Sequence, residues 1–117
     1  MSVHPIRLQI PFADTSLVFG FDADAERDVR LLLRFARARA SHGAGGFWLE
    51  YGWDTGESQM VWIDPAHMPT ARFDVTATPV ADQGREDDMS RHLARTHHVY
   101  LTAKGWQSDT HELAVDN

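Results

Sequence analysis

The strongest constraint on the fold is a strict alternation of apolar and polar residues in ARFDVTATPV, residues 71–80. Its apolar positions are Ala71, Phe73, Val75 and Ala77. Successive side chains of a β-strand point to opposite faces, so these four residues would share one face and the polar residues the other. A strand of this kind is typical of an antiparallel sheet with one face in water. The segment therefore predicts a sheet that is covered on one side.

Two β-hairpins are predicted elsewhere in the chain. IRLQI at 6–10 alternates like a half-buried strand, and the turn residues of PFADTS separate it from the apolar run LVFGF at 17–21. In the second hairpin, FWLEYGW at 47–53 and SQMVWID at 58–64 flank the short polar connection DTGE. Alternation places Trp48 and Glu50 on one face of the first of these strands. The opposite face takes Phe47, Leu49, Tyr51 and Trp53.

Two helices are predicted from apolar residues that recur every three or four positions. The first carries this pattern at Val29, Leu32, Leu33, Ala36 and Ala40, and Gly43 is well placed to end it. The second covers about residues 85–96, with Met89, His92, Leu93 and Thr96 on one face. HHVYLTA at 97–103 then indicates a further strand, and the last twelve residues fit either a strand or a short helix.

These elements predict one α+β domain over residues 1–117, in the order strand, strand, helix, strand, strand, strand, helix, strand. We expect an antiparallel sheet of five to six strands with two helices packed on it. A chain of 117 residues has room for one hydrophobic core, and 43% apolar and 24% charged residues are ordinary globular usage.

Composition narrows the function classes. The chain has no cysteine, which excludes disulfides, thiolate metal sites and thiol nucleophiles. No apolar run approaches the roughly 20 residues that span a bilayer, and the N-terminus lacks the pattern of a secretion signal, so we expect a soluble cytoplasmic protein that does not bind membranes. Ten arginines against one lysine, with abundant alanine, suggest a GC-rich bacterial or phage source.

The net charge of −6 argues against general nucleic-acid binding, which requires a cationic surface. One basic segment nevertheless stands out, because residues 27–39 contain five arginines and one acid. Helix geometry places four of these arginines within about 80° of each other, away from the apolar face. They are Arg27, Arg30, Arg34 and Arg37. This row could meet an acidic partner or a nucleic-acid backbone, or it could pair with acids of the same chain.

Three histidines lie close together in RHLARTHHVY, at His92, His97 and His98. His97 and His98 would point to opposite faces of a strand, so the three do not converge on one ion, and we predict no metal site and no cofactor. His92 or His98 could still act as an acid or base in a pocket between the sheet and a helix. The alternative is that both are structural.

Two groups of side chains suit a protein partner. One group consists of the tryptophans Trp48, Trp53 and Trp62. If these side chains are exposed, they offer a large contact area to a partner, and if both sheet faces are covered, they belong to the hydrophobic core. The acidic group comprises Glu50, Asp54 and Glu57 on the hairpin, with Asp82, Glu86, Asp87 and Asp88 before and within the second helix. Acids on this surface would attract a basic partner.

Three functional hypotheses follow. The first is a small non-catalytic protein that inhibits or regulates a macromolecular partner, in the manner of immunity proteins, antitoxins and phage inhibitors. The second is a small-molecule-binding domain or enzyme that uses a histidine as acid or base. The third is contact with nucleic acid through the arginine row. Patterns in the sequence do not decide whether the chain forms a homodimer.

Overall fold

The computed structural model describes residues 4–64, 66–75 and 83–107. Its strands are β1 (Ile6–Phe12), β2 (Thr15–Phe21), β3 (Phe47–Gly52), β4 (Ser58–Ile63), β5 (Thr70–Phe73), β6 (His98–Thr102) and β7 (Gly105–Trp106). A short 3-10 helix, η1 (Ala23–Ala25), leads into the helix α1 (Glu26–Ser41), and the helix α2 (Gln83–Thr96) precedes β6. The predicted α+β class, both helices and the strand order are confirmed.

The strands form two separate sheets, one of three strands and one of four. Sheet A has the order β2-β1-β5, and sheet B has the order β4-β3-β6-β7. All described pairs are antiparallel except β3 with β6, which run parallel. The division into two sheets and the parallel pair differ from the single antiparallel sheet that we expected. Parallel neighbours require a long crossover connection, and here α2 is part of it.

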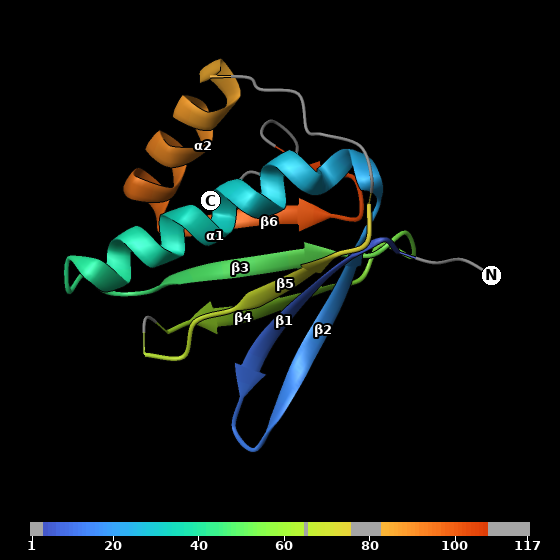
Figure 1. Ribbon diagram of the computed structural model, residues 1–117, viewed down its shortest axis with the longest axis horizontal. Coiled ribbons are helices and arrows are strands. Elements are labelled where there is room, and N and C mark those ends of the chain that lie inside the picture. Colours follow the sequence, from blue (N-terminus) through green and yellow to red (C-terminus); the bar gives the residue numbers. More distant parts are fainter. Residues whose placement is uncertain (1–3, 65, 76–82, 108–117) are drawn as a thin grey trace.

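Figure 1 shows the two helices gathered on one side of the molecule and the β1–β2 hairpin extending from the opposite side. The hydrophobic core takes residues from both sheets and both helices. Its largest fully buried members are Phe21, Phe47, Ile6, Leu8, Ile10, Leu32, Leu49, Ile63, Met89, Leu93 and Leu101. The members on β3 and β4, Phe47, Leu49 and Ile63, lie on one face of sheet B, because Phe47 pairs with Ile63 and side chains two positions apart on a strand share a face.

The element ends agree with the turn residues of the sequence. Helix α1 stops at Ser41, and Gly43 follows with φ of 68°, the left-handed conformation that glycine adopts without steric cost. Strand β5 is shorter than the alternating pattern, since it ends at Phe73, although Val75 still packs against the core. Ala77 and the predicted continuation of that strand lie outside the described residues, as does most of the ambiguous C-terminal segment.

A buried carboxylate joins both helices to sheet B. Asp28 of α1 accepts two hydrogen bonds from the guanidinium group of Arg85 in α2, at 2.8 and 2.9 Å, and one from the backbone N–H of Trp106, at 2.8 Å. Gly105 permits this approach, because a Cβ atom there would collide with the Asp28 carboxylate and its φ is 107°. Arg85 also donates to the Trp106 carbonyl at 2.7 Å. The contact fixes α2 against β7.

Candidate protein-binding surface

Three apolar side chains are exposed together on the outer face of sheet B, and we refer to Trp48, Met60 and Trp62 as the tryptophan face. Trp48 of β3 lies directly opposite Trp62 of β4, and their rings meet edge to face with centroids 5.1 Å apart. The two tryptophans are 42% and 45% exposed, and Met60 is also exposed. Large apolar side chains gathered in this way on a surface are typical of binding sites.

Both helices lie on the other side of sheet B, and β7 shows this directly. Trp106 pairs with Leu101 of β6, so it points to the inner face, where Leu101 is fully buried. Its ring lies 5.1 Å from the guanidinium of Arg85 and 6.0 Å from the ring of His92, both on α2. The backbone N–H of Trp106 donates a hydrogen bond to Asp28 of α1. Neither described helix therefore covers the tryptophan face.

A buried contact between a histidine and a carboxylate lies beside the tryptophans on the same outer face. Glu50 and His98 are only 5% and 4% exposed, and His98 Nε2 is 3.0 Å from Glu50 Oε1. The second carboxylate oxygen accepts a hydrogen bond from the Ser58 hydroxyl at 2.9 Å. A carboxylate is costly to bury unless it is paired and hydrogen-bonded, and these contacts meet that requirement.

Strand register explains why this pair forms where it does. In the parallel β3–β6 ladder, His98 lies beside Trp48, and Tyr100 lies beside Glu50. Tyr100 also extends over Gly52, where a Cβ atom would collide with its ring. Glu50 is thus enclosed by side chains of its own sheet. Sequence reasoning placed Glu50 on the outer face correctly, but it did not predict that Glu50 is buried.

The surroundings of the tryptophan face are acidic. Residues 47–64, which form the β3–β4 hairpin and its ends, contain four acids and no lysine, arginine or histidine. Asp54 and Glu57 are exposed in the turn, and Asp64 is exposed beyond the far end of β4. A partner that covers Trp48 and Trp62 would meet negative charge at both ends of the hairpin.

Trp53, the third tryptophan of the predicted group, lies on the other side of the sheet. It is 42% exposed and contacts Tyr51 and Phe19, at centroid distances of 5.1 and 6.0 Å. The Tyr51 hydroxyl donates to the Gly20 carbonyl at 2.6 Å and so joins the two sheets. Burial, and then the charges of Asp22 and Asp54, raise the pKa of Tyr51 above its ordinary value.

The arginine row is largely paired with acids of the same chain. Arg30 contacts Glu26 at 2.8 Å, Arg34 contacts Glu86 of α2 at 3.1 Å, and Arg27 lies 3.7 Å from Asp28. The guanidinium of Arg37 pairs with no acidic side chain of the described residues. The structure thus supports the alternative in which the row pairs within the chain.

The acidic group of α2 is also engaged in local contacts. Glu86 pairs with Arg34, Asp87 accepts a hydrogen bond from Gln83 at 3.0 Å, and Asp88 pairs with Arg91 at 2.6 Å. Asp82 lies outside the described residues. The structure thus pairs two of the α2 acids with arginines and the third with a glutamine, whereas the exposed acids of the hairpin belong to a different surface.

The three clustered histidines are separated. His98 is paired with Glu50, His92 lies against Trp106 on the inner side, and His97 is exposed at the α2–β6 junction with φ of 55°. His97 therefore precedes the strand that we expected it to begin. Within residues 4–64, 66–75 and 83–107, no group of three histidine or acidic side chains could hold a metal ion.

The sequence did not predict the contacts made by four residues: Asp28, Arg85, Ser58 and Tyr100. Asp28 resembled an ordinary acid of a helix N-terminus, and Ser58 an ordinary polar residue at the start of a strand. The one available signal was the position of Asp28 in the helical repeat, three and four residues before the apolar Leu31 and Leu32, which are both buried.

No protein-family model, curated protein or solved structure matches this chain. No helix in the described part of the chain is long and apolar enough to cross a lipid bilayer.

Proposed function

We propose that this protein binds a basic partner protein through the tryptophan face and thereby inhibits or regulates that partner, as immunity proteins, antitoxins and phage inhibitors do. The observation that carries the proposal is the exposure of Trp48 and Trp62 side by side on a sheet face that neither described helix covers. Tryptophan contributes large contact area at small entropic cost, and it is enriched among the residues that dominate binding energy.

Charge determines the kind of partner. The chain carries a net charge of −6, and the hairpin beneath the tryptophan face carries only acids. A basic surface would be attracted to it during association, and Asp54 and Glu57 would lie at the edge of the contact. Charged groups at the rim of an interface affect mainly the rate of association, whereas a desolvated aromatic centre supplies affinity.

The buried pair supports this binding surface. Glu50 of β3 contacts His98 of β6 and Ser58 of β4, so its side chain links three adjacent strands. The backbone beneath Trp48 and Met60 is thereby fixed before a partner binds. A preformed surface loses little conformational entropy on binding. Glu50 itself is buried and would contribute through the strands and not by direct contact.

Affinity capture from the source organism tests the proposal, with identification of the captured protein by mass spectrometry. We expect a basic protein that is retained by the unaltered chain and lost with the double variant Trp48→Ala and Trp62→Ala. Trp53→Ala is the matched control, because Trp53 is equally exposed but lies on the other side of the sheet. If no protein depends on Trp48 and Trp62 for capture, the proposal is wrong.

Once the partner is purified, charge reversal tests the electrostatic part. Asp54→Lys together with Glu57→Lys should slow association at low salt, and the difference from the unaltered protein should shrink as salt is raised. Stopped-flow mixing measures this rate. An association rate that is unchanged at low salt would contradict the role of the acidic rim while leaving the aromatic contact to be judged by the tryptophan variants.

A further inference from the structure

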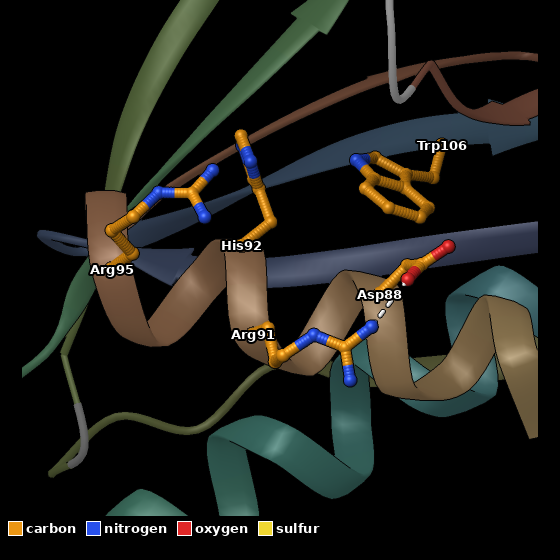
Figure 2. A pocket seen from close by; sticks show the side chains of 5 residues that line it. All are labelled: Asp88, Arg91, His92, Arg95 and Trp106. Atoms are coloured by element: carbon orange, nitrogen blue, oxygen red, sulfur yellow. Dashed lines mark hydrogen bonds and ion pairs between the residues drawn. The ribbon is translucent and has the colours of Figure 1, made fainter.

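A pocket of about 270 Å³ opens on the helix side of the molecule, away from the tryptophan face. Its lining comes from one face of α2 and from β7: Asp88, Arg91, His92, Arg95 and Trp106. Figure 2 shows Arg95 and His92 rising from α2 on the side where Trp106 lies, with the indole nitrogen turned toward His92. Arg91 instead extends along the helix toward Asp88.

Two hydrogen-bond donors in this pocket have no partner among the described residues. Arg95 is exposed in the last turn of α2, and its guanidinium group makes no ion pair or hydrogen bond within the described part of the chain. The same holds for the indole N–H of Trp106, whose other contacts are ring contacts and backbone hydrogen bonds. Guanidinium and indole groups donate hydrogen bonds and accept none, so together they suit an acceptor.

The charge of the lining favours an anion. The carboxylate of Asp88 is 2.6 Å from Arg91, and this pair is neutral overall. Arg95 then leaves the pocket with one net positive charge, in a chain whose net charge is −6. The carbonyl groups at the C-terminal end of α2 carry partial negative charge, so the attraction comes from the guanidinium and not from the helix dipole. Arginine binds carboxylate and phosphate oxygens with two parallel hydrogen bonds.

The wall of the pocket that Trp106 forms is held in place by several contacts. Trp106 is 5% exposed, and it is held on the backbone by Asp28 and Arg85 and on its ring by the Arg85 guanidinium. Donors that are fixed in place before a ligand arrives bind it at lower entropic cost. Pockets that enclose drug-sized ligands span roughly 300–1,000 Å³, so a cavity of this size suits a small ligand.

We propose that this pocket binds a small ligand that carries a phosphate or carboxylate group, held by the guanidinium of Arg95 and the indole N–H of Trp106. The site is independent of the proposed protein-binding function, because it uses other residues on the opposite face of sheet B. No chemical change of the ligand is implied.

The test follows the indole N–H of Trp106 by two-dimensional ¹H–¹⁵N NMR during titration with inorganic phosphate and, separately, with succinate. The three exposed tryptophans are assigned by Trp48→Phe, Trp53→Phe and Trp62→Phe, which leaves the fourth signal to Trp106. We expect a saturable shift of that signal with an apparent Kd on the order of 1 mM, and none with sodium chloride at matched ionic strength. A response to phosphate alone, succinate alone or both identifies the oxyanion that the site accepts.

Two substitutions should change the affinity in opposite directions. Arg95→Gln should weaken binding about tenfold or more, because it removes the charged donor. Asp88→Asn should strengthen binding, because it removes the competing carboxylate and releases Arg91. Arg72→Gln on β5 is the control, since it removes an exposed arginine far from the pocket in the fold, and it should leave the Kd unchanged.

The proposal is overturned if neither anion shifts the Trp106 signal saturably, if chloride produces the same shift, or if Arg95→Gln binds as tightly as the unaltered protein. Arg95 is exposed, so its replacement is expected to leave the fold intact, and the unchanged positions of the other three indole signals verify this.

Discussion

The two faces of sheet B consist of the same strands and differ in what covers them. The inner face is packed against both helices, and the buried acid on this side, Asp28 of α1, is bound by an arginine and a backbone N–H. The outer face has its own buried acid, Glu50, bound by a histidine and a serine, but only side chains of the sheet enclose it. Beside that pair, Trp48 and Trp62 stay exposed.

The two buried acids therefore differ in what their contacts hold together. The inner contact joins three elements that are far apart in the chain, so its loss would disturb the fold. The outer contact holds adjacent strands that the sheet already pairs, so its loss would disturb a surface. Arginine is charged at every physiological pH, whereas the charge of histidine depends on its proton. The inner contact is therefore expected to contribute more to stability than the outer one.

The largest expected effect is on the inner face. Asp28→Asn should lower the free energy of unfolding by about 3 kcal/mol, because it leaves the half-buried guanidinium of Arg85 without its charged partner. Urea denaturation followed by circular dichroism measures the change. Asp24→Asn, which alters an exposed acid of η1, should change stability by less than about 0.5 kcal/mol. Equal effects of the two variants would mean that the Asp28 contact does not stabilise the fold.

The next effect compares neighbours on opposite faces of β3. Leu49→Ala should cost about 2–4 kcal/mol, since Leu49 is fully buried and its loss leaves a cavity. Trp48→Ala should cost less than Leu49→Ala, although it removes a larger side chain, because Trp48 is nearly half exposed and its loss leaves no closed cavity. The same denaturation experiment compares them. A greater loss at Trp48 would mean that the tryptophan face is mainly structural, which would weaken the proposed function.

A smaller effect is expected from the outer buried acid. Glu50→Gln should lower the free energy of unfolding by about 1–2 kcal/mol, because an amide cannot accept hydrogen bonds from both His98 and Ser58 as a carboxylate does. Thermal and urea denaturation both report it. Glu57→Gln in the exposed turn provides the reference and should be nearly neutral. A cost as large as that of Asp28→Asn would show that the outer pair also stabilises the fold.

The smallest effect on stability is expected from an exposed ion pair at the edge of sheet A. This pair provides a reference value for the two buried contacts of sheet B. The hydrogen bond from Arg72, with that from Arg7, lowers the pKa of Asp74 below its ordinary value. A lowered pKa in the folded state stabilises the protein above the unfolded-state pKa, and this contribution is lost as the pH falls through the folded-state pKa.

Asp74→Asn should therefore be slightly less stable than the unaltered protein at pH 7, and the difference should disappear as the pH falls below about 4. Melting temperatures measured from pH 7 to pH 2.5 test this. A difference that grows toward low pH would contradict the direction of the shift.

The spacing of apolar residues was sufficient to predict the helices and strands and to assign the buried face of β3. Alternation assigned Leu49 and Tyr51 to the interior and Trp48 to the outer face, because the period of a strand is set by backbone geometry alone. Helical spacing located α1 and α2 for the same reason. These predictions depend only on residues a few positions apart.

Long-range contacts could not be predicted in this way. Asp28 and Arg85 are 57 positions apart, and Glu50 and His98 are 48 apart. The second pairing depends on the parallel contact between β3 and β6, and the first on the packing of α2 against α1, and no local signal indicates either. An acid near a helix start and an acid on a hairpin look alike in the sequence, although one is buried by helices and the other by a neighbouring strand.

The close approach of Asp28 to Gly105 has a consequence for how this chain can vary. Position 105 is restricted twice, by its positive φ and by the carboxylate beside it. Replacement of Asp28 by a smaller residue would relieve the second restriction but leave the first, so Gly105→Ala should remain unfavourable in an Asp28→Ala background. A change at Asp28 alone therefore does not make position 105 tolerant of a side chain. We expect Asp28 and Gly105 to be retained together, or to change only when the turn around Gly105 also changes.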